Sequence, residues 1–87
     1  MRAIKIATRA MKYLDAHRDR REGILGRLQK IAEDPTRRDL DIKPFDVKHV
    51  YRLRVGSARV VYEVTEQAIL VGLIDDRGDV YKKSRRR

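Results

Sequence analysis

The sequence contains no cysteine and no tryptophan, and only two of its 87 residues are histidines. The missing cysteines exclude disulfide bonds, thiolate catalysis and zinc sites built on Cys ligands. His17 and His49 are too few for a typical structural zinc site, so we expect neither a metal nor another cofactor. No apolar run approaches the roughly 18 residues of a membrane-spanning helix, and the N-terminus lacks a hydrophobic signal segment. These absences predict a cytoplasmic location and no membrane partner.

Aromatic residues are also scarce, at 6% of the sequence. A base-stacking platform of the kind that single-strand binders use would therefore be thin. Positive charge, by contrast, is abundant: 22 Lys and Arg residues oppose 13 Asp and Glu residues, giving a net charge of +9. Such a charge indicates a polyanionic partner, which is a nucleic acid, an anionic membrane surface or an acidic protein. A chain of this length forms one domain, residues 1–87.

The N-terminal half has mainly helical periodicity. Residues 2–6 alternate and predict a short edge strand, after which Thr8 is the expected N-cap of a helix over residues 8–17. A second helix, with Asp19 as its expected cap, ends at Pro35. Its apolar positions recur at three- and four-residue spacing: Ile24, Leu25, Leu28, Ile31 and Ala32. The two helices are expected to form an antiparallel hairpin with one apolar face.

From residue 47 the apolar period changes to two, which is typical of strands. Residues 47–55 and 58–64 predict two strands joined by Gly56-Ser57, a two-residue connection that favours a type II′ hairpin. Residues 68–74 are apolar at every position except Gly72, as in a strand that is covered on both sides. The C-terminal half is therefore expected to form an antiparallel meander.

Residues 36–46, between the helices and the strands, predict a polar connection interrupted by Pro44. Ile42 and Phe45 are expected to anchor this connection in the core. Two helices followed by an antiparallel meander define an α+β fold. We expect the two N-terminal helices to pack on one face of a twisted antiparallel sheet.

The Gly56-Ser57 turn places Arg54 opposite Arg59, and strand alternation adds Arg52 to the same sheet face. Like charges directly opposite one another destabilise a strand pair by roughly 0.2–1 kcal/mol, so stability alone would not select this arrangement. Two interpretations remain open. The arginines either form a cradle for phosphate groups, or they belong to the solvated face of a basic protein and are partly neutralised by Glu63.

The C-terminal residues hold further candidates. Arg77 and Tyr81 lie four positions apart, after the last long strand, where the chain can return beside the arginines. The pKa of a tyrosine hydroxyl is ordinarily near 10, and neighbouring cations lower it, so Tyr81 is either a base or an edge aromatic residue. The following basic residues, among them Lys82 and Lys83, form either a solubilising tail or contacts to backbone phosphates.

The stretch of residues 51–64, YRLRVGSARVVYEV, resembles the hairpin motif of the RelE/ParE superfamily of toxin–antitoxin toxins. Residues 77–81, RGDVY, and the helical segment before Pro35 fit the same superfamily, so the resemblance covers nearly the whole chain. It implies a compact, microbial-ribonuclease-like domain. In the RelE branch, the toxin enters the ribosomal A site and cleaves mRNA without a metal, because the 2′-hydroxyl of the messenger attacks the adjacent phosphate. The implied partners are an antitoxin protein, the ribosome and mRNA.

The resemblance also implies roles for particular residues. Arg59 would stabilise the transition-state phosphate, Arg77 would assist the leaving group or stack with the substrate, and Tyr81 would serve as the base or its substitute. Arg52 and Arg54 would orient the substrate. The full set of expected RNA-binding residues is Arg52, Arg54, Lys48, Lys82 and Lys83.

The sequence departs from the family pattern at several positions. Ser57 stands where the family often has an acidic residue, and Ala58 stands where an aromatic residue is common. Asp75 and Asp76 lie where the family often has a basic residue or histidine, and two acids there would weaken phosphate binding. The ParE branch inhibits DNA gyrase and generally lacks the terminal tyrosine, so Tyr81 favours the RelE branch. Gyrase inhibition and non-catalytic binding of nucleic acid or ribosomes remain the alternatives.

Overall fold

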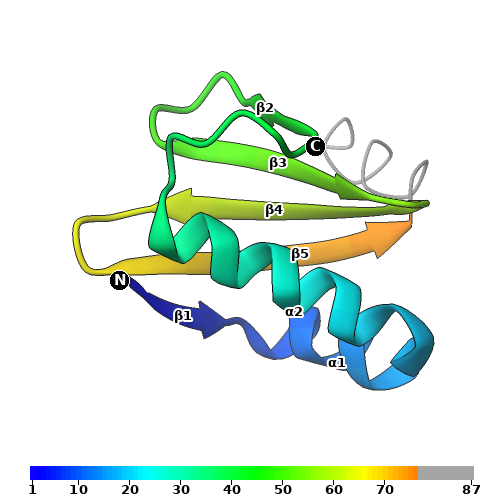
Figure 1. The fold of residues 1–87 in the computed structure, drawn as a ribbon. Coiled ribbons are helices and arrows are strands. Elements are labelled where there is room, and N and C mark those ends of the chain that lie inside the picture. The colour runs from blue at the N-terminus through cyan, green and yellow to red at the C-terminus, as the bar shows by residue number, and fades with distance from the viewer. Residues whose placement is uncertain (77–87) are drawn as a thin grey trace.

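The computed structural model describes residues 1–76 and forms a two-layer α+β fold (Figure 1). Its strands form one five-stranded sheet in the order β1-β5-β4-β3-β2. The elements are β1 (Ala3–Ile6), α1 (Thr8–Ala16), α2 (Arg18–Glu33), β2 (Ile42–Pro44), β3 (Val50–Val55), β4 (Ala58–Val64) and β5 (Ala68–Asp76). The α+β expectation is confirmed. The sheet, however, is mixed, because the edge strand β1 runs parallel to β5.

Both helices pack on one face of the sheet, which we call the helix face. The apolar residues that the helical spacing selected are buried there, in one cluster with side chains from the central strands, except Leu25, which is partly buried against the cluster. From the helices this cluster takes Ala10, Tyr13, Leu14, Ile24, Leu28, Ile31 and Ala32, and from the strands it takes Leu53, Ala58, Val60, Tyr62, Ile69, Val71 and Ile74. Burial of this surface supplies the main driving force for folding.

The β3–β4 hairpin has the expected register, in which Arg54 lies opposite Arg59 and Tyr51 lies opposite Tyr62. Gly56 has a φ of +59°, a left-handed conformation that glycine adopts without steric cost. The φ of Ser57 is not positive. This combination is typical of a type II′ turn, in which only the first of the two loop residues has a positive φ. The turn prediction is therefore confirmed.

Neither predicted helix cap forms. The residue before α1 is Ala7, whose amide donates to the carbonyl oxygen of Val71 at 2.8 Å and so still belongs to the sheet edge. Thr8 is consequently the first helical residue rather than the cap. His17 precedes α2, and Asp19 lies in the first turn of that helix. At this position the carboxylate of Asp19 still interacts favourably with the helix dipole.

The connection before β3 contains a strand that the sequence pattern does not predict. Ile42–Pro44 pairs with β3, and Pro44 lies opposite Tyr51. A proline is tolerated here because β2 is the edge of the sheet and needs no inward amide donor at that position. Ile42 packs against the core as expected, whereas Phe45 is 36% exposed and does not anchor the connection.

Strand β3 begins at Val50 rather than at Val47, because a turn precedes it. The amide of Val50 donates to the carbonyl oxygen of Val47 at 3.2 Å, and His49 has a φ of +67°. That left-handed backbone interrupts the extended conformation. Val47 is left 62% exposed.

Strand β5 carries a bulge at Gly72. Tyr62 pairs with Val71 and Val61 pairs with Leu73, so one residue of β5 has no partner on β4. Such a bulge reverses the alternation of side chains between the two faces. Beyond Gly72, Ile74 therefore points to the helix face, while Asp75 lies opposite Arg59 on the other face.

The expectation that residues 68–74 are covered on both sides is wrong for the part of the chain that the structure describes. Ile69, Val71 and Ile74 are buried against the helices. Leu70 and Leu73 point to the opposite face and are only half-buried. The described residues place no second layer on that opposite side, which we call the open face.

Candidate nucleic-acid interface

Four charged residues lie side by side across the open face in one cross-strand row: Asp41, Arg54, Arg59 and Asp75. Asp41 immediately precedes β2, and its carbonyl oxygen accepts the amide of Arg54 at 2.9 Å. Arg54 pairs with Arg59, and Arg59 pairs with Asp75. This charged row therefore has an acid at each end and two arginines between them.

The carboxylate of Asp41 contacts two arginines. Its Oδ2 lies 3.5 Å from Nε of Arg54, and its Oδ1 lies 3.7 Å from Nη2 of Arg52. Arg52 belongs to the neighbouring row, where Lys43 is its partner on β2. Arg52 and Arg54 are thus the two cations that contact the first acid of the charged row.

Two of the three arginines are buried. Arg52 is 7% exposed and Arg59 is 4% exposed, while Arg54 is half-buried. A guanidinium group removed from water is costly unless other groups compensate its charge. The interpretation as a merely solvated basic face is therefore wrong for Arg52 and Arg59.

Asp41 and Asp75 also give the arginines a different electrostatic environment from the one expected from the sequence. Considered alone, the Arg54–Arg59 pair is repulsive. In the structure, Asp41 and Asp75 border that pair on either side. Glu63, the neutralising residue expected from the sequence, lies at the far end of the hairpin, opposite Val50.

The remaining predicted site residues are placed differently. Lys48 is exposed in the turn before β3, at the end of the strand opposite to Arg54, so it does not join the charged row. The other four lie outside the described residues: Arg77, Tyr81, Lys82 and Lys83.

The two adjacent aspartates at the end of β5 have separate environments. Asp76 faces the helices, where its Oδ1 accepts hydrogen bonds from the Tyr13 hydroxyl at 2.9 Å and from Nη1 of Arg20 at 2.8 Å. The same Arg20 nitrogen donates to the Tyr13 hydroxyl at 2.6 Å. The ring of His17 stacks on that of Tyr13 at 3.9 Å. Only Asp75 therefore lies on the face that carries the arginines.

This Asp76 cluster (Tyr13, His17, Arg20 and Asp76) has a distinct electrostatic character. The hydrogen bond from Tyr13, together with Arg20, holds the pKa of Asp76 below its usual value. Burial raises the pKa of Tyr13. The cluster thus favours an ionised carboxylate at the end of β5 and fastens that end to both helices.

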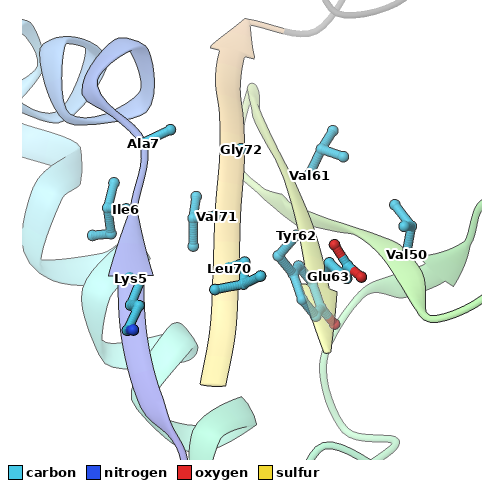
Figure 2. A pocket seen from close by; sticks show the side chains of 10 residues that line it. All are labelled: Lys5, Ile6, Ala7, Val50, Val61, Tyr62, Glu63, Leu70, Val71 and Gly72. Carbon is cyan, nitrogen blue, oxygen red and sulfur yellow. The ribbon is translucent and has the colours of Figure 1, made fainter. Parts of the chain in front are cut away.

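A shallow depression of about 480 Å³ lies on the open face, and Figure 2 shows the residues that line it. Its walls include the apolar side chains of Val50, Val61 and Leu70, with Lys5 and Glu63 among the lining residues. The described aromatic side chains form no stacking platform next to the row. Tyr13, Tyr51 and Tyr62 belong to the core or pack against it, and Phe45 follows β2. The arrangement is better suited to binding phosphates than to stacking bases.

Asp41, Lys43 and Asp75 are the members of this surface that sequence reasoning did not select as site residues. The alternation of Asp41, Ile42 and Lys43 was the available signal for a strand, but Pro44 favoured a loop. Among residues 1–76, no group of three His, Cys, Asp or Glu side chains is placed to hold a metal ion. None of the helices in that range is long and apolar enough to cross a membrane.

No protein-family model matches the sequence, and no curated protein matches it significantly. Solved structures do match. The archaeal RelE–RelB complex from Pyrococcus horikoshii OT3 contains a chain that superimposes with a TM-score of 0.77 at 23% identity, over 88% of this chain and 96% of that one. The isolated RelE toxin of E. coli gives a TM-score of 0.74 at 20% identity, over 97% and 95% of the two chains.

A chain of the RelB–RelE antitoxin–toxin complex from Methanococcus jannaschii is also similar, with a TM-score of 0.68 at 25% identity over 91% of this chain and 96% of that one. The protein therefore has the RelE-type toxin fold of the microbial-ribonuclease class. Within the superfamily that the hairpin motif resembles, these neighbours represent the RelE branch.

Proposed function

We propose that this protein is the toxin of a toxin–antitoxin pair and that it acts in the cytoplasm as a ribosome-dependent, metal-independent mRNA endonuclease. The observation that carries the proposal is the charged row on a RelE-type fold. Arg54 and Arg59 lie opposite one another, and Arg52 extends the same surface. Several guanidinium groups held together on one rigid sheet are suited to a substrate with closely spaced phosphates.

The proposed reaction is transesterification within the RNA chain. The 2′-hydroxyl oxygen forms a bond to the adjacent phosphorus and loses its proton, while the bond from phosphorus to the 5′-oxygen breaks and that oxygen gains a proton. Arg59 stabilises the negative charge that develops on the phosphate oxygens. Following the family resemblance, Tyr81 accepts the proton and Arg77 assists the leaving oxygen.

Dependence on the ribosome has a physical reason in this proposal. A tyrosine is a poor base at neutral pH, so the reaction gains most from a substrate that is held in the attacking geometry. The ribosome holds a codon in that way. Free RNA has no comparable constraint, and its cleavage is expected to be slow.

The proposed antitoxin is a protein with an acidic segment that covers the open face. Two of the similar structures are complexes of a RelE chain with RelB. The net charge of +9 on this chain favours such a partner. Binding of the antitoxin at the charged row would exclude RNA from the same residues.

The test is primer extension on mRNA in a reconstituted translation reaction, with and without ribosomes. We expect new 5′ ends within ribosome-occupied codons and none when ribosomes are omitted. Arg59→Gln should lower the cleavage rate roughly 100-fold or more. Arg27→Gln, at an exposed position on α2, is the matched control and should retain the wild-type rate. Thermal unfolding must show that both variants are folded.

Two further results bear on the proposal. Tyr81→Phe should abolish cleavage while leaving the fold intact, and an unchanged rate would remove Tyr81 from the reaction. Absence of cleavage by folded wild-type protein would contradict the proposal as a whole. A supercoiling assay with DNA gyrase would then test the alternative activity within the superfamily.

A further inference from the structure

Asp41 has a fixed main chain and a loosely paired side chain. Its carbonyl oxygen accepts the amide of Arg54 at 2.9 Å, which continues the β2–β3 pairing by one residue. Its carboxylate is 49% exposed and contacts Arg52 and Arg54 at 3.7 and 3.5 Å. These distances exceed the roughly 2.7–2.9 Å of a strong charge-assisted hydrogen bond. The carboxylate is therefore held near the arginines without being locked to them.

A second ion pair in the same connection has a carboxylate that is held firmly by two short hydrogen bonds. Asp39 accepts two hydrogen bonds from Arg37, from Nε at 2.6 Å and from Nη2 at 2.9 Å. This is the two-pronged geometry that arginine prefers with carboxylates and phosphates. Asp41, which meets two arginines at longer distances, has no such geometry with either of them.

The two arginines converge on one anion. Each oxygen of the Asp41 carboxylate faces a different guanidinium group. A phosphodiester likewise presents two unesterified oxygens, so it is a chemically matched replacement for the carboxylate. The side chain of Arg52 is only 9% exposed, which means that its charge needs an anion nearby in the free protein as well as in a complex.

We propose that the Asp41 carboxylate is a displaceable counter-ion that occupies the place of one substrate phosphate. The inference rests on the proposed function, because it takes the phosphate to be that of an RNA strand. In the free protein, Asp41 keeps Arg52 and Arg54 side by side and compensates their charge. When RNA binds, a phosphate replaces the carboxylate, and the loss of the Asp41 contacts lowers the affinity for any strand that arrives without other support. This cost is the same for every strand, so a strand binds tightly only where further contacts, such as those of a larger assembly, offset it.

The test measures binding of a single-stranded 2′-deoxy oligonucleotide, which lacks the attacking hydroxyl and is not cleaved. Asp41→Asn should tighten binding roughly fivefold at low salt, because two weak ion pairs no longer compete. Asp41→Glu, which keeps the charge, should bind like the wild type.

Asp39→Asn is the matched control, because it removes the same charge from the same connection but leaves Arg52 and Arg54 untouched. It should change the affinity by less than about twofold. Equal tightening by the two Asn variants would reduce the effect to net charge and overturn the proposal. Weaker binding by Asp41→Asn, with a folded protein, would also overturn it, because Asp41 would then merely position the arginines.

Arg54→Gln separates this inference from the proposed function. If Arg54→Gln weakens binding and Asp41→Asn leaves it unchanged, the arginines bind the strand and only the counter-ion role fails. If neither the wild type nor any variant binds the oligonucleotide, the counter-ion role fails, and the cleavage assay with ribosomes decides the proposed function separately.

Discussion

The two faces of the sheet are built from the same strands but by different physical rules. On the helix face, Leu53, Val60 and Ile69 are fully buried beneath α1 and α2. On the open face, the neighbouring residues of the same strands are charged or half-buried, and the charged row crosses β3, β4 and β5 and ends at Asp41, just before β2. Apolar burial stabilises the fold on one side. The other side concentrates charge that a stable fold does not require.

The two faces differ most sharply at Asp75 and Asp76, which are adjacent in the chain. Asp76 is held by Tyr13 and Arg20 from the helices, whereas Asp75 lies opposite Arg59. The bulge at Gly72 determines this assignment. Without the extra residue, alternation would exchange the two aspartates between the faces. A single local irregularity thus decides which acid contributes to stability and which one lies beside the arginines.

The largest effect is expected from a substitution that disrupts the packing on the helix face. Leu53→Ala should lower the free energy of unfolding by about 2–5 kcal/mol, because it removes a fully buried side chain and leaves a cavity. The matched change on the open face is Leu73→Ala, at a half-buried position, which should cost clearly less. Urea unfolding of both variants measures the difference. Equal losses would mean that the open face contributes as much to stability as the core does.

The next largest effect is expected from removing a positive charge from the open face. Arg52→Met should lower RNA binding and cleavage by about 10- to 100-fold, the range for losing a charged hydrogen bond. The free energy of unfolding should stay within about 1 kcal/mol of the wild type, because an apolar side chain of similar length replaces a buried ion at little cost. Urea unfolding and the cleavage assay are run on the same preparation. A large loss of stability would place Arg52 among the structural residues instead.

The sequence was sufficient to predict the features that depend on local pattern. The helical spacing from Ile24 to Ala32, the strand over residues 58–64 and the register set by Gly56-Ser57 all follow from periodicity and turn chemistry, and the structure confirms them. The α+β fold follows from the order of these elements. The conserved geometry of a hairpin makes residue pairs such as Arg54 and Arg59 predictable without a structure.

What the sequence did not predict depends on contacts between distant segments. The strand Ile42–Pro44 is three residues long and exists because β3 offers it a partner. The parallel pairing of β1 with β5 joins residues more than sixty positions apart. No sequence pattern marks the bulge at Gly72. Because the bulge decides which face each residue beyond it occupies, the separate environments of Asp75 and Asp76 could not be predicted. The acids that border the arginines, Asp41 and Asp75, were missed for these reasons.

A smaller effect is expected from the acid that faces the helices. Asp76→Asn should lower the free energy of unfolding by about 1 kcal/mol at neutral pH, because the hydrogen bonds from Tyr13 and Arg20 lose their charged acceptor. The hydrogen bond from Tyr13 lowers the pKa of Asp76 in the folded protein. The ionised carboxylate therefore stabilises the fold above the unfolded pKa, and this contribution is lost as the pH falls through the folded pKa.

The difference in unfolding free energy between the wild type and Asp76→Asn should accordingly be constant above about pH 5 and shrink below about pH 4. Urea midpoints measured between pH 2.5 and 7 test this. Asp34 and Asp39 also have lowered pKa values, but both remain in the variant, so their contributions cancel in the difference. A difference that does not change with pH would show that the ionisation of Asp76 contributes nothing to stability.

The smallest effect concerns the bulge that assigns the two aspartates to their faces. A Cβ atom added at Gly72 meets no other atom within 4 Å, and its backbone does not have a positive φ. Gly72→Ala should therefore raise the free energy of unfolding by about 0.4–1 kcal/mol, because alanine restricts the unfolded chain. Gly56→Ala is the contrasting control. Its Cβ also meets open space, but the φ of +59° makes alanine strained there, and stability should fall by about 1 kcal/mol. If Gly72→Ala instead destabilises the protein as much as Gly56→Ala does, the bulge requires glycine, and the placement of Asp75 beside Arg59 depends on that single residue.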